Sequence, residues 1–144
     1  MGYNVSVYSF YGIRIQFEQL INYFSFICKE EILSDGYSFD EEAEEWITQV
    51  KGLDNLFKKH FGYNLGIAQK GENPSKYYLI VNEARLVYKY NTDSTEYEEL
   101  PYELDISELS PPTKDQNDEI KAIMSKLKVD EYKISPWVIC DESY

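Results

Sequence analysis

Apolar and polar residues alternate along the first part of the chain with the period of a β-strand. Val5 and Val7 are separated by polar residues, and the stretch 3–15 is rich in β-branched and aromatic side chains. That combination is typical of a strand. The phase of the alternation shifts near Tyr8 and Gly12, and we expect a bulge or bend at Gly12.

Beyond residue 16 the period changes to that of a helix. Apolar residues recur every three or four positions over 17–28, which predicts a helix ending near Gly36. A second helix is expected to begin after Asp40, to kink or split at Gly52 and to end at Gly62. One stripe of this helix is predicted to lie in the core: Trp46, Ile47, Val50, Phe57 and Phe61.

The middle of the chain returns to short β-patterns. Strands are expected over 64–69, 77–81 and 86–90, and the last two are joined by a tight connection over 82–84. The acidic stretch 91–110 has the composition of a loop, because it contains proline and no apolar period.

A final helix and a closing strand complete the pattern. Thr113 is expected to cap a helix over 114–128 whose buried face is Ile120, Ile123, Met124 and Leu127. The closing strand is expected over 132–140, with Pro136 at an edge position or a bulge. The order β-α-α-β-β-β-α-β predicts an α+β fold, with a mainly antiparallel sheet and about three helices packed on one face.

Length and composition are those of one folded domain spanning 1–144. The chain has 144 residues, 43% hydrophobic and 16% aromatic, and such a content of aromatic residues is not typical of disorder. Its two cysteines, Cys28 and Cys140, do not form a disulfide framework. We expect no signal peptide and no membrane span, and therefore a cytoplasmic protein, in the cytoplasm of a host if a virus encodes it.

Charge is the most unusual property, and it is concentrated in two blocks. The net charge is −12, from 26 acidic and 14 basic residues. The segment 30–50 holds eight acids and the segment 90–113 holds seven, and neither block contains a base. Such a balance argues against direct nucleic-acid binding and favours either a solvated surface or a basic protein partner.

Motifs for catalysis are missing from the sequence. It contains no phosphate-binding glycine loop, nucleophile elbow, calcium loop or His/Cys cluster. The single histidine, His60, falls at a predicted helix C-terminus, where a cation is favourable without any catalytic role. No cofactor and no metal are expected, and the fold should be metal-independent.

The tyrosine-rich acidic segment 88–108 is the predicted binding site. Tyrosine supplies rigid amphipathic contact area, and the carboxylates would attract a basic surface. The residues expected to contact the partner are Tyr90, Asp93, Glu96, Tyr97, Glu98, Glu99, Tyr102, Glu103 and Asp105.

The resulting hypothesis is a non-enzymatic interaction module that engages a basic protein surface. In one form it is an inhibitor encoded by a phage or virus that imitates nucleic acid and occupies a nucleic-acid-binding protein. A structural or assembly subunit of a larger viral complex is an alternative. A small enzyme or ligand-binding domain with a carboxylate-lined pocket is another. The sequence does not indicate an oligomeric state.

Overall fold

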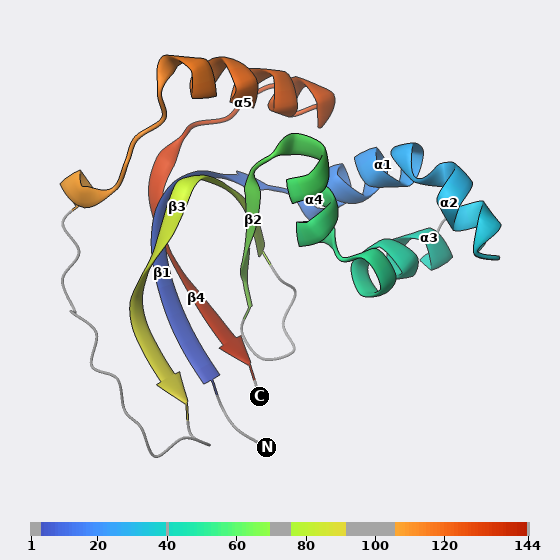
Figure 1. Cartoon of the computed structure of the whole chain (residues 1–144), viewed down its shortest axis with the longest axis horizontal. Coiled ribbons are helices and arrows are strands. Elements are labelled where there is room, and N and C mark those ends of the chain that lie inside the picture. The colour runs from blue at the N-terminus through green and yellow to red at the C-terminus, as the bar shows by residue number, and fades with distance from the viewer. Residues whose placement is uncertain (1–3, 40, 70–75, 92–105, 144) are drawn as a thin grey trace.

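A four-stranded antiparallel sheet organises the molecule, and helices gather at one end of it (Figure 1). The computed structural model describes residues 4–39, 41–69, 76–91 and 106–143. The strands are β1 (Asn4–Ile15), β2 (Asn64–Ala68), β3 (Lys76–Asn91) and β4 (Ser135–Ser143). They lie in the order β2-β3-β1-β4, so β1 and β3 are central and β2 and β4 are the edges.

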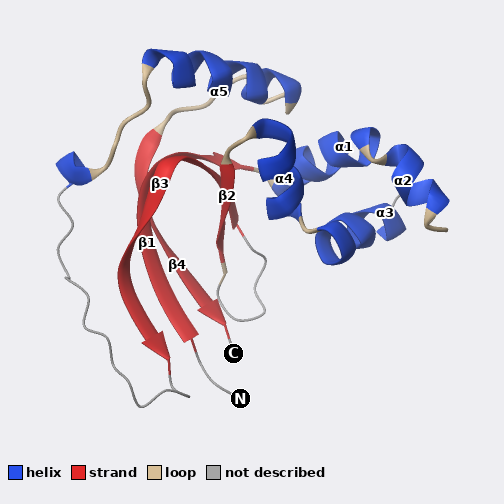
Figure 2. Ribbon diagram, viewed as in Figure 1, coloured by secondary structure: helices blue, strands red, loops and turns tan. Residues whose placement is uncertain are grey.

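The helical segments follow β1 and β3 in sequence and lie beside the sheet or across one end of it (Figure 2). They are α1 (Phe17–Ile27), α2 (Lys29–Ser34), α3 (Glu41–Glu45), the π-helix η1 (Trp46–Lys51), α4 (Leu53–Phe61), the 3₁₀-helix η2 (Ile106–Glu108) and α5 (Lys114–Lys126). The α+β class and the antiparallel sheet are therefore confirmed. The described residues form five α-helices, whereas about three were expected. Each of the two expected N-terminal helices is divided: Cys28 separates α1 from α2, and η1 separates α3 from α4.

Strand β3 is one long irregular strand rather than two strands joined by a turn. Its pairing with β1 shifts register between Val7 and Tyr8 and again between Ser9 and Tyr11. At the second shift, extra residues around Asn82 bulge out of β3, and Asn82 has a φ of +64°. The expected tight connection over 82–84 is thus wrong: the turn-forming residues there make a bulge, which bends a strand without reversing it.

Gly12 lies within an unbroken β1 and is not a bulge or bend; the register shifts lie at Tyr8, where the alternation changes phase, and between Ser9 and Tyr11. A Cβ atom at Gly12 would clash with the backbone carbonyl oxygen of Leu79 and lie 2.7 Å from the Phe10 ring. Glycine is therefore required here by close packing and not by a bend.

The sheet curls until its two edges approach each other. The backbone N–H of Glu142 in β4 donates to the carbonyl oxygen of Gln69, just after β2, at 2.7 Å. The curl separates two clusters of buried side chains. Phe10, Tyr78, Ile80 and Ile139 form the smaller cluster, on one face of the sheet.

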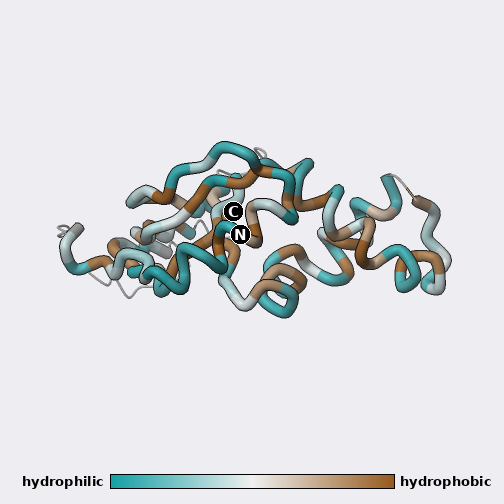
Figure 3. The backbone as a smooth tube through the Cα atoms, turned by 90° about the horizontal axis from the view of Figure 1, so that it is seen from above, coloured by the Kyte–Doolittle hydropathy of each residue, from teal (hydrophilic) through white to brown (hydrophobic). Residues whose placement is uncertain are grey.

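The larger cluster joins the other face of the sheet to the helices. Ile13 and Ile15 of β1 and Leu79 and Val81 of β3 pack against buried residues of the helices. These helical residues are Leu20, Phe24, Ile32, Ala43, Trp46, Ile47, Leu53, Phe57, Ile120, Ile123 and Met124. Hydrophobic and hydrophilic positions alternate along the helices, as Figure 3 shows, and this amphipathic pattern places helices on that one face.

The predicted core stripe of the second helix is confirmed except at one position. Trp46, Ile47 and Phe57 are fully buried, and Phe61 is half-buried, but Val50 is 57% exposed. The backbone N–H of Gly52 bonds to the carbonyl oxygen of Ile47, five residues earlier. This π-helical spacing rotates Val50 away from the face that a 3.6-residue period assigns to it.

The C-terminal elements agree closely with expectation. Thr113 caps α5, accepting a hydrogen bond from the Gln116 backbone N–H at 3.2 Å, while the Gln116 side chain accepts from the Thr113 backbone N–H at 2.9 Å. The four predicted buried residues of this helix and its end are all buried. Pro136 lies in the edge strand β4, where a missing N–H costs little. None of the helices in the described parts of the chain has the length and apolarity needed to cross a bilayer.

Candidate protein-interaction surface

The predicted contact residues fall mostly in a segment whose structure is not described. Tyr90 lies in β3 and is 36% exposed. Eight others lie outside the described residues: Asp93, Glu96, Tyr97, Glu98, Glu99, Tyr102, Glu103 and Asp105.

The two tyrosines that lead into this segment lie on one face of the sheet. Tyr90 is opposite Val5 and Tyr88 is opposite Val7 in β1. On β4, Val138 is opposite Ser9 and is 70% exposed. We call Val5, Val7, Tyr88, Tyr90 and Val138 the sheet surface. On β1 it lies on the same face as Ile13 and Ile15, which the helices cover, because side chains two residues apart in a strand share a face.

The other end of the acidic segment is attached to the sheet by an ion pair. The Arg85 guanidinium Nη1 lies 2.8 Å from Glu108 Oε2, and both side chains are half exposed. Glu108 is one of the seven acids of the second block. It is therefore partly neutralised within the chain.

The first acidic block is described almost completely, and its helices are held together by its own side chains. The Trp46 indole N–H donates to Asp35 Oδ2 at 3.0 Å, joining η1 to the end of α2. Lys51 Nζ lies 3.3 Å from Glu31 Oε2 and 5.3 Å from the centre of the Trp46 ring. These contacts connect α2 to η1 at two points.

One further acid has a structural role. The Ser38 backbone N–H donates to Glu42 Oε2 at 2.8 Å, and this hydrogen bond lowers the pKa of the Glu42 carboxyl. Since Ser38 precedes α3, Glu42 closes the N-terminal end of that helix. The carboxylates of Glu31, Asp35 and Glu42 thus have structural roles within the chain.

Helices α1 and α2 are nearly continuous and have an inner and an outer apolar stripe. The Cys28 N–H donates to the carbonyl oxygen of Phe24, and the Ile32 N–H donates to that of Cys28. The inner stripe, formed by Phe24, Cys28 and Ile32, faces the core.

Phe26 and Leu33 lie on the opposite side of these helices with Glu30 between them, at the i, i+4, i+7 spacing of one helix face. Phe26 is 80% exposed and Leu33 is 52% exposed. Phe39, which follows α2, lies next to this stripe: the centre of its ring is 5.3 Å from the Nζ of Lys29, the first residue of α2.

Four exposed carboxylates of α2 and α3 have no side-chain partner among the described residues: Glu30 of α2 and Glu41, Glu44 and Glu45 of α3. We call Phe26, Glu30, Leu33 and Phe39 the helical surface. The carboxylates of α3 add negative charge to the same group of helices. Exposed apolar side chains bordered by polar residues are typical of a protein-binding site.

His60 of α4 is paired with Tyr23 of α1. The Tyr23 hydroxyl lies 2.7 Å from His60 Nε2, and the Tyr23 ring stacks on Phe61 at 5.3 Å. Burial and, less strongly, the nearby Lys126 lower the pKa of His60. A neutral imidazole accepting the tyrosine proton fits this environment, so the contact has a structural explanation.

Other perturbed groups occur singly. Burial and a 2.6 Å hydrogen bond to Glu119 raise the pKa of Tyr63 to about 12. Burial raises the pKa of the Asp141 carboxyl at a small apolar pocket of about 250 Å³ inside the curled sheet. Within the residues that the structure describes, no group of three or more His, Cys, Asp or Glu side chains is placed to hold a metal ion.

Sequence analysis missed the helical surface as a site. The predicted binding site lay in the second acidic block, and the outer side of α1 and α2 was not considered. The sequence does indicate this surface, because Phe26 and Leu33 are apolar residues that lie outside the helical stripe of Phe24, Cys28 and Ile32.

Comparisons of the chain with protein-family models, curated proteins and solved structures gave no match.

Proposed function

We propose that the protein is an interaction module whose helical surface binds a basic segment of another protein that also carries apolar side chains. The observation that carries the proposal is the exposed stripe of Phe26 and Leu33, with the Glu30 carboxylate between them and without a partner among the described residues. Apolar burial would supply affinity, and the carboxylates would select a basic partner and accelerate association.

The apolar stripe also distinguishes between kinds of partner. A surface that only imitates nucleic acid needs regularly spaced negative charge, since a phosphate backbone offers little apolar area. Phe26 and Leu33 instead favour a partner with apolar side chains of its own, such as an amphipathic basic helix.

Site-specific photo-crosslinking tests the proposal. A photoreactive phenylalanine analogue at position 26 should capture a defined protein from the cells in which this chain is made. The matched control carries the same analogue at position 138, because Val138 is similarly exposed but lies on the sheet surface. Capture from position 26 alone supports the proposal, and equal capture from both positions contradicts it.

The charge contribution is tested in the same assay. Replacing Glu30, Glu41, Glu44 and Glu45 together with Gln should leave the melting temperature within a few degrees and reduce capture, more so at low salt. Unchanged capture would contradict the role of the carboxylates. Capture of a second copy of this chain would show instead that the stripe is a self-association interface.

The sheet surface with the segment 88–108 is a second candidate, favoured by the exposure of Tyr90 and Val138. Replacing Glu96, Glu98, Glu99 and Glu103 with Gln tests it. Lost capture at an unchanged melting temperature would transfer the proposal to this segment, and unchanged capture would exclude it.

A further inference from the structure

A pocket of about 250 Å³ lies inside the curled sheet, and residues of all four strands line it. Tyr8 of β1 is opposite Ile139 of β4, and Asp141 lies two residues farther along β4. Phe10 is two residues beyond Tyr8, and Ile80 of β3 belongs to the same buried cluster as Phe10. Because side chains two residues apart share a face of a strand, these five residues lie on one face of the sheet and meet at the pocket.

The pocket has an apolar end and a polar end. Phe10 is fully buried, Ile139 is 6% exposed, and Asp141 is half-buried. On β2, Gly66 places only backbone beside Ile80, because a Cβ atom there would lie 3.0 Å from the Cδ1 of Ile80. A ligand would therefore meet apolar side chains and strand backbone at one end and a carboxylate at the other.

Asp141 is the charged residue among the described lining residues of this pocket. Its carboxylate makes no hydrogen bond or ion pair within the part of the chain that the structure describes. Burial raises the pKa of this carboxyl, because the charged form loses hydration that no partner replaces. A ligand cation beside Asp141 would compensate for that lost hydration.

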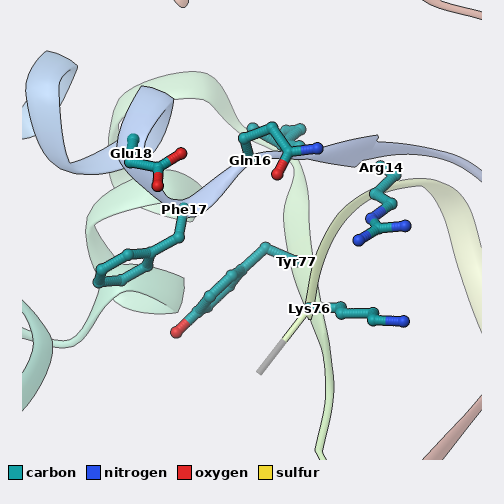
Figure 4. A pocket seen from close by; sticks show the side chains of 7 residues that line it. Arg14, Gln16, Phe17, Glu18, Lys76 and Tyr77 are labelled. Carbon is teal, nitrogen blue, oxygen red and sulfur yellow. The ribbon is translucent and has the colours of Figure 1, made fainter. Parts of the chain in front are cut away.

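The charged and aromatic side chains of a second pocket, of about 440 Å³ where β1 passes into α1, do not meet in this way (Figure 4). Arg14 is opposite Tyr78, and Lys76 is two residues from Tyr78 on β3, so both cations lie on that face of the sheet. Tyr77 lies on the opposite face, where its ring stacks on Phe17 with 5.6 Å between the ring centres. The pocket inside the curled sheet is therefore the site whose lining can act on one ligand.

The volume of the pocket inside the sheet limits the size of its ligand. An apolar cavity of roughly 150 Å³ holds benzene, so this pocket has room for one ring with a short chain. The Phe10 ring forms part of the wall, and aromatic rings pack favourably against one another in edge-to-face or offset arrangements.

We infer that this pocket binds a small arylalkylamine, a protonated amine joined by a short chain to one aromatic ring. The ring contacts Phe10, Ile80 and Ile139, and the ammonium group donates hydrogen bonds to the Asp141 carboxylate. The net charge of −12 also attracts cations to the protein and repels anions. The site lies in the strands, so it is separate from the helical surface and does not depend on it.

The test is titration of the ¹⁵N-labelled protein with 2-phenylethylamine, 2-phenylethanol and 3-phenylpropionate, followed by NMR. These probes share a ring and a short chain and differ in charge. We expect the amine to shift the amide signals of Tyr8, Phe10 and Asp141 and to bind about tenfold more tightly than the alcohol, because hydrogen bonds between charged groups are stronger than neutral ones. The propionate should bind most weakly.

Three results of this titration would contradict the proposal. Equal binding of the alcohol would overturn the role of the Asp141 carboxylate. Tighter binding of the propionate would overturn the preference for a cation. An absence of shifts at Tyr8, Phe10 and Asp141 would overturn the site.

A charge-matched pair of variants locates the effect. Asp141→Asn should weaken binding of the amine to about the level of the alcohol, roughly tenfold. The control, Asp118→Asn, removes the same charge from an exposed position on α5. Equal weakening in the two variants, or unchanged amine binding in Asp141→Asn, would overturn the proposal. If Asp141→Asn does not fold, the ratio of amine to alcohol affinity in the unaltered protein decides the question.

Discussion

Single side chains decide how firmly the helical group is held, and Trp46 is the clearest case. It is fully buried, its indole N–H bonds to Asp35, and the Lys51 ammonium lies over its ring. Val50 belongs to the same turn of π-helix but points outward.

We expect Trp46→Ala to reduce the free energy of unfolding by about 3–5 kcal/mol, the cost of removing a large buried aromatic side chain. Val50→Ala should change it by less than about 0.5 kcal/mol, because exposed side chains contribute little to stability. Urea denaturation of both variants measures the difference. Similar losses in the two variants would mean that the π-helical register is wrong.

His60 makes the stability depend on pH. Burial lowers its pKa in the folded state below the ordinary value of 6.5, so the unfolded chain binds the proton more readily. The stabilising contribution is complete above pH 6.5 and is lost as the pH falls through the folded-state pKa.

Melting temperatures between pH 8 and pH 6 should therefore decrease towards acid, and His60→Gln should flatten the slope. Since His60 is the only histidine, other side chains interfere little in this range. An identical slope in the variant would show that the Tyr23–His60 contact does not favour the neutral ring.

At the level of elements, the periodic patterns predicted most helices and strands, and their failures have local causes. The apolar spacing of α5 and its Thr113 cap were readable because both signals lie within the helix and its first flanking residue. The bulge around Asn82 could not be predicted in this way, because turns and bulges use the same residue types. They differ in pairing: the segments that flank a turn pair with each other, whereas those that flank a bulge pair with the same neighbouring strand. Here both halves pair with β1.

The candidate sites were less predictable than the elements. The contacts between β1 and β3 depend on a register that places Ile15 opposite Tyr77, although residues 16–75 lie between these two strands in sequence. No local pattern carries that information. The outer stripe of Phe26 and Leu33 is local, but its meaning depends on knowing which side of the helix is covered.

Thr113 offers a test at the scale of one element. Thr113→Ala should destabilise the protein by about 1 kcal/mol, because it leaves the Gln116 backbone N–H without its acceptor. Thr113→Ser keeps the hydroxyl and should lose much less. Thermal denaturation of the pair measures this, and equal losses would mean that the methyl group matters more than the cap.

For the whole molecule, the net charge of −12 sets a background of self-repulsion. Salt screens exposed charges over distances of about 10 Å at 0.1 M. We therefore expect the melting temperature to rise between 20 and 300 mM KCl, roughly, as the repulsion is screened.

The quadruple variant of Glu30, Glu41, Glu44 and Glu45 to Gln should show a smaller rise, since it removes four of the repelling charges. Binding of a basic partner should respond in the opposite direction and weaken with salt. A melting temperature that falls on adding KCl would indicate that attractive ion pairs outweigh the repulsion.

The position of β1 at the centre of the sheet has a consequence for how the protein folds. Its neighbour β4 is the last of the four described strands in sequence, and Asn4 is paired with Ser143. During synthesis, β1 is made before the other three strands, and this side of it is hydrogen-bonded only after β4 has followed. Pairing across so long a sequence separation is typical of slow folders. Until β4 arrives, one edge of β1 is open to incorrect pairing with other chains, so the nascent protein is more prone to aggregation than the finished one.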